Sequence, residues 1–452
     1  LPFLIPGLGL FAHRLWQYLL WIGLTAGAAV ALSRRVFTSE ERSIKWLAAG
    51  WIFLYLLRVG VYYHLELMVI IPLLFISGRH PWRTLIAVII ASIWAGISRV
   101  NWFPMPAMIA ITIYLLETPL NSIDSTPLSL KQIVSYLSQP ILWGVVGLAS
   151  ALLTQVAYVY ISGNANNKVA FTSSFTSDLL WYRLWPNDNY SLGIIPAILL
   201  ISGPCIAVMI LAARQWKALH GLRWLGLIFM LAALFAGSVV VSVKIGGGGD
   251  LHDMDTYVIL AAIVAFYFVG GHAQAEPNQA LLPIRSIPVF AVAVITPVLF
   301  LIPLLSPYPV YNEIRNQEAY RQLIGLVNEA GKKGPVLFIN DRELVTMGDV
   351  KVPLVYDYEA VTLMEMAMSG NQTYLQMFHN DLATHRFAAI VGMKQKLAIK
   401  QDGLFAEENN VWNTGVSRFI LCYYTPISLI EPDGNNVEVY VPGGDPRVCP
   451  RK

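Results

Sequence analysis

The chain has 452 residues, of which 56% are hydrophobic and 13% are charged, and its mean hydropathy is +0.55. Soluble domains average about 45–50% apolar and about 25% charged residues, so this composition excludes a disordered chain, a fibrous repeat and an ordinary cytosolic enzyme. Residues 1–305 hold 17 Lys and Arg against 11 Asp and Glu, whereas residues 306–452 hold 14 against 17. We therefore expect a polytopic α-helical membrane domain over 1–305 and a soluble domain over 306–452.

Apolar runs long enough to cross a bilayer dominate the first of these two parts. A hydrocarbon core of roughly 30 Å requires about 20 apolar residues in a helix. The run from Trp46 to Ile76 is too long for one span and is interrupted by Arg58, His64 and Glu66, which predicts a hairpin of two short helices with these residues at its turn. The total is about ten membrane segments, the others being 15–32, 84–98, 104–117, 139–161, 190–212, 224–243, 256–271 and 287–305.

Basic residues in the short loops predict the orientation, because cytoplasmic loops carry an excess of Lys and Arg. The loops 33–45 and 214–223 are both basic and are predicted to face the cytoplasm. Counting spans from them places 98–103, 162–189 and 244–255 on the outer face, together with the domain 306–452. We expect an integral protein of the cytoplasmic (plasma) membrane with an extracytoplasmic C-terminal domain. Because the excess positive charge lies in these loops, it does not indicate nucleic-acid binding.

Short strands alternate with helical patterns in residues 306–452, which predicts a small α/β domain. The helices are expected over 316–330, 361–368 and 374–385. The strands are expected over 336–340, 352–356, 387–391, 419–424 and 437–441, the last two forming a hairpin. The segment contains no GxGxxG, P-loop or GxSxG motif, so we expect no catalytic centre in it.

The cysteines and the titratable residues of the C-terminal domain give little indication of chemistry. Cys205, Cys422 and Cys449 are an odd and sparse set, which predicts neither a disulfide framework nor a CxxC metal site. Glu407 and Glu408 are expected to be solvated, and we expect the same of His379, Asp381 and His385.

The densest polar cluster of the membrane domain is Lys244–Asp255, with the sequence KIGGGGDLHDMD between two apolar runs. Consecutive glycines let the backbone turn tightly and expose N–H groups that can bind a phosphate. We therefore predict that Gly247 and Gly248, with the charge of Lys244, bind a lipid phosphate. The alternative is a glycine-rich connector solvated by its acidic residues.

The same cluster contains the predicted catalytic residues Asp250, His252 and Asp255. Carboxylates and an imidazole suit general base catalysis, and carboxylates also bind hard divalent cations. A divalent cation is the one candidate cofactor, and the sequence does not specify its ligands.

Two further groups of ionisable residues lie in outer turns of the predicted membrane domain. Charged groups within apolar segments are costly and indicate function, so Arg58, His64 and Glu66 are predicted to bind the substrate. A structural Arg58–Glu66 ion pair is the alternative. Arg99 is predicted to bind a phosphate, although the neighbouring Trp102 is also typical of an interfacial aromatic belt. Aromatic residues in the loop 162–189 fit either sugar stacking or interfacial anchoring.

This layout resembles the GT-C class of membrane glycosyltransferases, of the protein O-mannosyltransferase and lipid-A aminoarabinose-transferase type. The resemblance covers the architecture of the whole chain, and its most specific residues are Lys244–Asp255 and Arg58–Pro72, each leading into a helix. It implies a lipid-phosphate sugar donor, chemistry at the outer face and a catalytic Asp or Glu in the first outer loop. This chain shows no such loop, because the first span directly after Leu1 resembles a span that comes later in the family's order. We therefore expect either that this acid lies in an upstream segment or that the protein is not active.

Two hypotheses of different classes follow. The preferred one is glycosyl transfer from a polyprenyl-phosphate-linked sugar to an acceptor at the outer face of the membrane. The apolar helices would hold the prenyl tail, and the glycine-rich loop with Lys244 and Arg58 would hold the phosphate. The alternative is a non-catalytic subunit or scaffold of a membrane complex, with partner membrane subunits and an exported docking domain.

Overall fold

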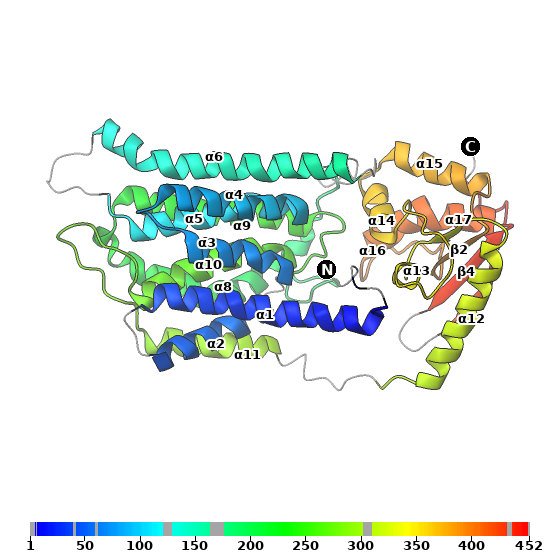
Figure 1. The fold of residues 1–452 in the computed structure, drawn as a ribbon, viewed down its shortest axis with the longest axis horizontal. Helices are drawn as coiled ribbons and strands as arrows, with labels where there is room; N and C mark the ends of the chain where they lie inside the picture. Colours follow the sequence, from blue (N-terminus) through cyan, green and yellow to red (C-terminus); the bar gives the residue numbers. More distant parts are fainter. Residues whose placement is uncertain are drawn as a thin grey trace.

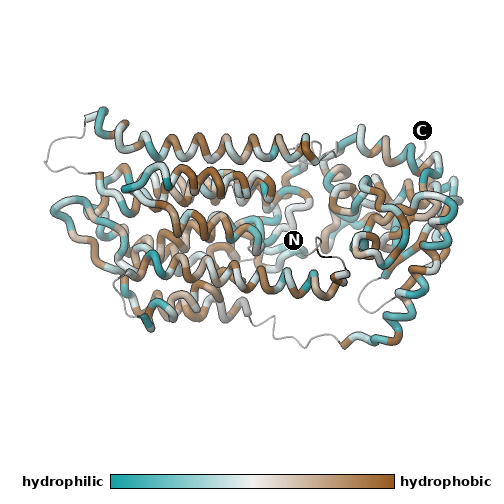
Figure 2. Tube along the Cα trace, viewed as in Figure 1, coloured by the Kyte–Doolittle hydropathy of each residue, from teal (hydrophilic) through white to brown (hydrophobic). Residues whose placement is uncertain are grey.

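The computed structural model divides into a long helical bundle and a smaller domain of helices and strands at one end of it (Figure 1). It describes the chain except residues 1–4, 6, 39–41, 59–61, 121–128, 163–175, 302–309, 432–435 and 451–452. Hydrophobic residues cover the bundle helices, and hydrophilic ones gather at the bundle ends and in the smaller domain (Figure 2). This division agrees with the change of composition near residue 305.

Seven helical segments of the described chain are long and apolar enough to cross a membrane. They are α1 (Leu10–Val36), α4 (Pro81–Ser98), η3 with α5 (Val100–Trp102 and Met105–Glu117), α6 (Leu130–Ile161), α8 (Ile194–Ala213), α9 (Gly221–Val243) and η6 with α10 (His252–Met254 and Asp255–Gly270). Each coincides with a predicted span, and α11 (Ile287–Leu301) coincides with the last one. The total of about ten membrane segments stays a prediction.

The predicted division of 46–76 into two short helices is confirmed, and both helices pack against α1. The helix α2 (Arg42–Arg58) is followed by a short 3-10 helix, η2 (Tyr63–Glu66), and then by α3 (Leu67–Phe75). His64 and Glu66 therefore lie in the turn, as expected. Arg58 is the last residue of α2, and its side chain lies outside the described part of the structure.

Small residues let the bundle helices approach closely. A Cβ on Gly96 of α4 would lie 2.4 Å from the Ala151 carbonyl oxygen of α6. A Cβ on Gly147 of α6 would lie 2.9 Å from Val88 and 3.0 Å from Ala107. Apolar helices in lipid gain little from burying apolar surface, so such close packing is what holds them together. The helix α10 is buried on nearly all sides and forms the centre of the bundle.

The two basic loops lie at one end of the bundle, because Arg35 and Arg223 tie both to the end of α5. Arg35 binds Glu117 at 2.8 Å, and Arg223 binds Glu276 at 2.8 Å while its guanidinium also donates to the carbonyl oxygens of Leu115 and Leu116. This arrangement puts the loops 33–45 and 214–223 on a common side, as predicted. The side of the membrane that each end faces stays a prediction.

The C-terminal domain is built on a mixed four-stranded sheet in the order β1-β2-β4-β3. β1 (Val336–Phe338) runs parallel to β2 (Ala389–Met393), and β4 (Val437–Pro442) pairs antiparallel with β2 and with β3 (Tyr424–Ile430). Successive strand residues point to opposite faces, so Val336 packs under α12 (Glu313–Gly331), whereas Leu337 packs against α14 (Ala360–Met368) and α15 (Gln372–Ala383). The sheet is thus covered by helices on both faces.

Two predicted strands of this domain are wrong. Residues 352–356 form no strand, and 419–424 lie mostly in the helix α17 (Arg418–Tyr423). The helix α16 (Ala406–Trp412) continues through a π-helical turn (Asn413–Ser417) into α17. A short apolar run looks the same in a buried helix and in a strand, which explains the second error. The remaining short helix is α13 (Glu343–Thr346).

A disulfide between Cys422 and Cys449 corrects the expectation that the cysteines form no bridge. The chain after β4 runs back along the end of α17, since Gly443 donates its N–H to the Tyr423 carbonyl oxygen and Asp445 donates to that of Leu421. This return brings together two cysteines separated by 27 residues, which spacing alone does not reveal. Cys205 is free and buried in α8.

Candidate functional site

Three short turns bring most of the predicted site residues together at one end of the bundle. They are η2 at the hairpin, η3 between α4 and α5, and η6 at the start of α10. Each turn is a 3-10 helix that leads directly or nearly directly into a helix, so its polar side chains are held by a buried element rather than by a mobile loop. We call this group the acid cluster; it consists of Glu66, Arg99, Asp250, His252, Asp253 and Asp255.

Arg99 forms the centre of the acid cluster. Its guanidinium donates to Oδ1 of Asp253 and, at 3.4 Å, to Oδ2 of Asp255. Asp255 is fully buried and also accepts from Trp102 Nε1 at 2.8 Å and from the Thr256 N–H at 2.7 Å. Both oxygens of Asp255 are therefore used, so its carboxylate positions Arg99 and Trp102. Arg99 also lies over the ring of Tyr62, 5.2 Å from its centroid.

Other carboxylate oxygens of the acid cluster are left without partners. Asp253 is buried, and its Oδ2 makes no hydrogen bond to the described residues. Glu66 is fully buried, and neither of its carboxylate oxygens has a described partner. A buried polar group without a hydrogen bond costs free energy, and one guanidinium does not balance three buried carboxylates. These oxygens can accept a proton or the hydrogen of a bound hydroxyl group.

His252 and Asp250 form a dyad beside Asp253. The Asp250 carboxylate faces His252 Nδ1 and also accepts the His252 N–H at 2.9 Å. Because an ionised carboxylate only accepts, Nδ1 donates to Asp250, and Nε2, which lies 3.4 Å from Asp253 Oδ1, donates to it when the imidazole is protonated. Burial raises the pKa of Asp250, but the hydrogen bonds from His252 outweigh it and hold this pKa below its ordinary value.

The glycine-rich loop has the tight backbone that its sequence predicts. Gly248 has a φ of +79°, and a Cβ there would lie 2.8 Å from Cε1 of His252. Gly247 closes the turn through its N–H to the Lys244 carbonyl oxygen, and a Cβ there would lie 2.3 Å from the Val241 carbonyl oxygen. The glycines therefore let the backbone pass close to α9 and to the His252 ring.

The first half of this loop contacts the C-terminal domain. Lys244 Nζ lies 3.3 Å from Oε2 of Glu365, and the Gly246 N–H donates to Oε1 of Glu408 at 2.9 Å. A Cβ on Gly246 would lie 2.3 Å from the Met368 side chain. In this structure Lys244 thus binds a carboxylate of α14, in the place where the sequence predicts a lipid phosphate.

Arg183 is the main ionic link between the two domains. It lies in the short helix η4 (Trp181–Leu184), is fully buried, and donates to both oxygens of Glu408 at 2.9 Å and to Glu407 at 3.3 Å. Burial raises the pKa of Glu408, but the hydrogen bond from Arg183 holds it below its ordinary value. The expectation that Glu408 is solvated is therefore wrong, because it is buried at the domain contact.

Of the two histidines of the C-terminal domain, His379 is half-buried in packing contacts, whereas His385 is exposed, as expected. His379 stacks on Phe419 with ring centroids 3.2 Å apart and contacts the Gly415 carbonyl oxygen through Nε2. His385 contacts the Tyr423 carbonyl oxygen at 3.1 Å. His64 of the hairpin accepts the Trp94 Nε1 hydrogen through its backbone carbonyl at 2.7 Å, and its ring stacks near Tyr62.

A divalent cation finds no ready site in the described part of the chain. No group of three or more His, Cys, Asp and Glu side chains there is placed to hold a metal ion. Within the acid cluster, the guanidinium of Arg99 fills the space between Asp253 and Asp255 that a cation would take.

Sequence reasoning placed Asp253 in the polar cluster without choosing it as a catalytic residue, and it missed Arg183 as a domain link. Both lie within segments that the sequence singled out, but only the three-dimensional structure places Arg183 against a carboxylate 225 residues later. Comparison of the chain with models of known protein families, with curated proteins and with solved structures gives no match.

Proposed function

We propose that the chain transfers a glycosyl group from a polyprenyl-phosphate-linked sugar to an acceptor hydroxyl at the outer face of the membrane, as the GT-C resemblance implies. The observation that carries this proposal is the buried Oδ2 of Asp253, which has no hydrogen-bond partner among the described residues and lies beside Arg99 and His252. A desolvated carboxylate of this kind is a stronger base than a solvated one. A neighbouring guanidinium can bind the phosphate.

In the proposed step, the acceptor oxygen attacks the anomeric carbon and the bond from that carbon to the phosphate oxygen breaks. Polyprenyl phosphate leaves with the bonding electron pair, and the acceptor proton passes to Oδ2 of Asp253. His252, oriented by Asp250, holds the other oxygen of Asp253. Arg99 faces the phosphate, which competes with Asp255 for its Nη1. This assignment replaces Asp255 by Asp253 as the base, and it changes the role of Asp250 and His252 from catalytic to positioning.

The proposed location has two supports. The basic loops lie at the bundle end opposite to the acid cluster and to the C-terminal domain, and cytoplasmic loops are enriched in Lys and Arg. The Cys422–Cys449 bridge lies in the C-terminal domain, and disulfides persist mainly in oxidising compartments. Both favour an extracytoplasmic C-terminal domain of a plasma-membrane protein.

The test is release of polyprenyl phosphate from a polyprenyl-phosphate hexose by the full chain in lipid vesicles. Asp253→Asn and His252→Ala should lower the rate by at least about 10²-fold, the usual contribution of a general base. Asp188→Asn is the control, because Asp188 is an exposed carboxylate at the same end of the bundle. If Asp253→Asn transfers as fast as Asp188→Asn, the proposal fails.

The scaffold hypothesis is the second candidate, and the contacts of Lys244 and Gly246 with the C-terminal domain favour it. In that case, the glycine-rich loop is a docking surface for the C-terminal domain and not a phosphate-binding site. Lys244→Ala would then weaken the domain contact, and neither the wild-type protein nor this variant would show glycosyl transfer. A measurable wild-type transfer rate contradicts the scaffold hypothesis.

A further inference from the structure

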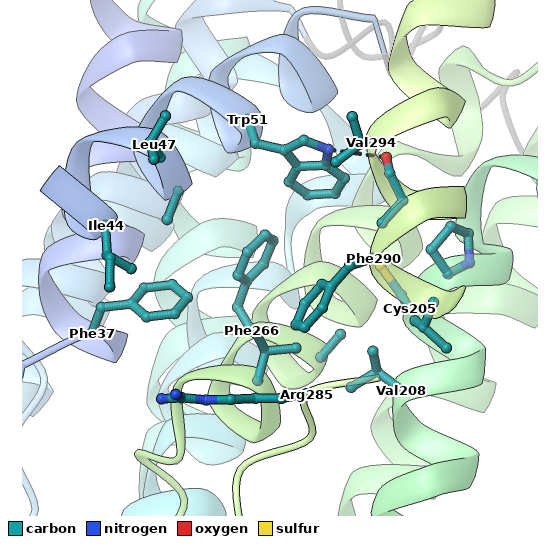
Figure 3. Close-up of a pocket in the computed structure, with 16 residues that line it drawn as sticks. Phe37, Ile44, Leu47, Trp51, Cys205, Val208, Phe266, Arg285, Phe290 and Val294 are labelled. Atoms are coloured by element: carbon teal, nitrogen blue, oxygen red, sulfur yellow. Dashed lines mark hydrogen bonds between the residues drawn. The ribbon is translucent and has the colours of Figure 1, made fainter. Parts of the chain in front are cut away.

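A second feature lies in the half of the bundle that contains the basic loops. It is an apolar cavity of about 340 Å³ between α2, α8, α10 and α11. Aromatic rings border it in Figure 3, where Phe37, Phe266, Phe290 and Trp51 surround the open space. The cavity lies far from the acid cluster, since Ala265 in its wall follows Asp255 by ten residues, about 15 Å along α10.

The polar atoms of Trp51 and Cys205 in the cavity wall already have partners in the protein. Trp51 Nε1 already donates to the Ala293 carbonyl oxygen at 2.9 Å, and the Cys205 sulfur lies 4.0 Å from the Tyr55 hydroxyl. The other described side chains that line the cavity are hydrocarbon, with the exception of Arg285. Apolar cavities of this kind stay free of water and accept apolar ligands.

The guanidinium of Arg285 lies at one end of the cavity. Arg285 precedes α11 by two residues and is exposed, and Figure 3 shows its guanidinium at the edge of the apolar lining. It belongs to the bundle end that carries the basic loops 33–45 and 214–223, since Gln215 of the second loop bonds to the backbone of Leu282. An apolar cavity with a guanidinium at its rim matches an amphiphile with an acyl chain and an anionic head group, and basic pockets between membrane helices bind such head groups.

We propose that this cavity binds one acyl chain of an anionic glycerophospholipid from the leaflet at the basic end, with the lipid phosphate against Arg285. The bound lipid fills the space between α2 and α11, which the Trp51–Ala293 hydrogen bond joins across the cavity. It is a resident lipid, distinct from the sugar donor, because its head group lies at the opposite end from the acid cluster. The inference does not depend on glycosyl transfer.

The experiment uses the full chain in vesicles that contain phosphatidylglycerol with a photoreactive group in its acyl chain. Crosslinked peptides are mapped by mass spectrometry. We expect labelling on α10 and α11 around Phe266 and Val294. Ala293→Phe fills the cavity and should abolish this labelling. Ala291→Phe is the matched control, because Ala291 lies exposed on the same helix and outside the cavity wall, and it should label as the wild type does.

The head-group contact is tested separately. Arg285→Gln should lower the retention of phosphatidylglycerol by about fivefold, as expected for one lost basic residue at an anionic surface. Arg214→Gln, an exposed basic residue in another loop of the same end, should not. Equal labelling by a zwitterionic photoreactive lipid would overturn the anionic assignment. Displacement of the label by polyprenyl phosphate would assign the cavity to the sugar donor and overturn the inference.

The melting temperature of each variant separates lost binding from lost folding. If Ala293→Phe does not fold, wild-type protein in vesicles with and without phosphatidylglycerol gives the second measurement. A melting temperature that rises with phosphatidylglycerol, and falls back in Arg285→Gln alone, supports the inference. The same melting temperature in both lipid mixtures contradicts it.

Discussion

Replacing Arg183 by Met should detach the C-terminal domain from the bundle. The substitution keeps an apolar stem but removes the guanidinium that donates to both oxygens of Glu408. Glu408 would lose its cationic partner but stay in a buried position, where it still accepts the Gly246 N–H. Breaking a buried ion pair by removing one partner costs about 3–5 kcal/mol. The equilibrium for opening the domain contact should therefore shift by at least about 10²-fold.

Hydrogen exchange measures this opening directly. Amides at the contact, in Asp178–Leu184 and Lys244–Asp250, should exchange at least about 10²-fold faster in Arg183→Met, while amides in the centre of α10 keep their protection. Arg386→Met is the matched control, because Arg386 is half exposed and its pair with Asp381 should contribute at most about 1 kcal/mol.

A double variant decides whether the buried pair itself is responsible. Arg183→Met with Glu408→Met removes both charges and leaves no carboxylate unpaired, so it should recover much of the lost protection. The reasoning is refuted if Arg183→Met exchanges like Arg386→Met. It is also refuted if the double variant opens more than Arg183→Met alone.

Three further predictions concern topology, the glycine-rich loop and pH. A cysteine at the exposed Lys332 should react with an impermeant thiol reagent in intact cells, whereas one at Arg34 should not; the reverse pattern would invert the topology. Gly248→Val should lower the free energy of unfolding by about 1–2 kcal/mol or more, because the backbone has a positive φ there and the new side chain meets the His252 ring. Gly237→Val is the control in thermal unfolding, because a Cβ at Gly237 meets nothing within 4 Å. Burial raises the pKa of Glu408, but the hydrogen bond from Arg183 outweighs burial and lowers it. The stability that ionised Glu408 gives to the domain contact is therefore complete above the ordinary carboxylate pKa of about 4.3 and is lost as pH falls through the lowered pKa. Amides at the domain contact that lose protection, relative to their intrinsic exchange rates, already between pH 7 and 5 would contradict this prediction.

The sequence predicts the membrane helices well because each is a long apolar run whose length matches a bilayer. The hairpin turn at His64 and Glu66 and the tight turn at Gly248 also follow from local signals, namely interrupting charges and consecutive glycines. In contrast, the partners of the charged residues depend on contacts between distant segments. Nothing near Lys244 indicates Glu365, which lies 121 residues later.

The same limit explains the errors in the C-terminal domain. A six-residue apolar run such as 419–424 carries too few turns to distinguish helix from strand. The Cys422–Cys449 pairing depends on how the chain returns after β4, which spacing does not encode. Asp253 differs from Asp255 only in what surrounds it, so a sequence that contains both cannot say which keeps an unpartnered oxygen.

The link between Arg183 and Glu408 also bears on how the protein is made. Arg183 leaves the ribosome long before its carboxylate partner, which follows 225 residues later. At usual rates of synthesis this gap lasts roughly 10–45 s. During that interval the guanidinium lacks its Glu408 partner, so the segment around η4 can complete its contacts only after the C-terminal domain has been synthesised. A chain truncated before α16 would keep its apolar helices but would leave this segment permanently in its nascent form.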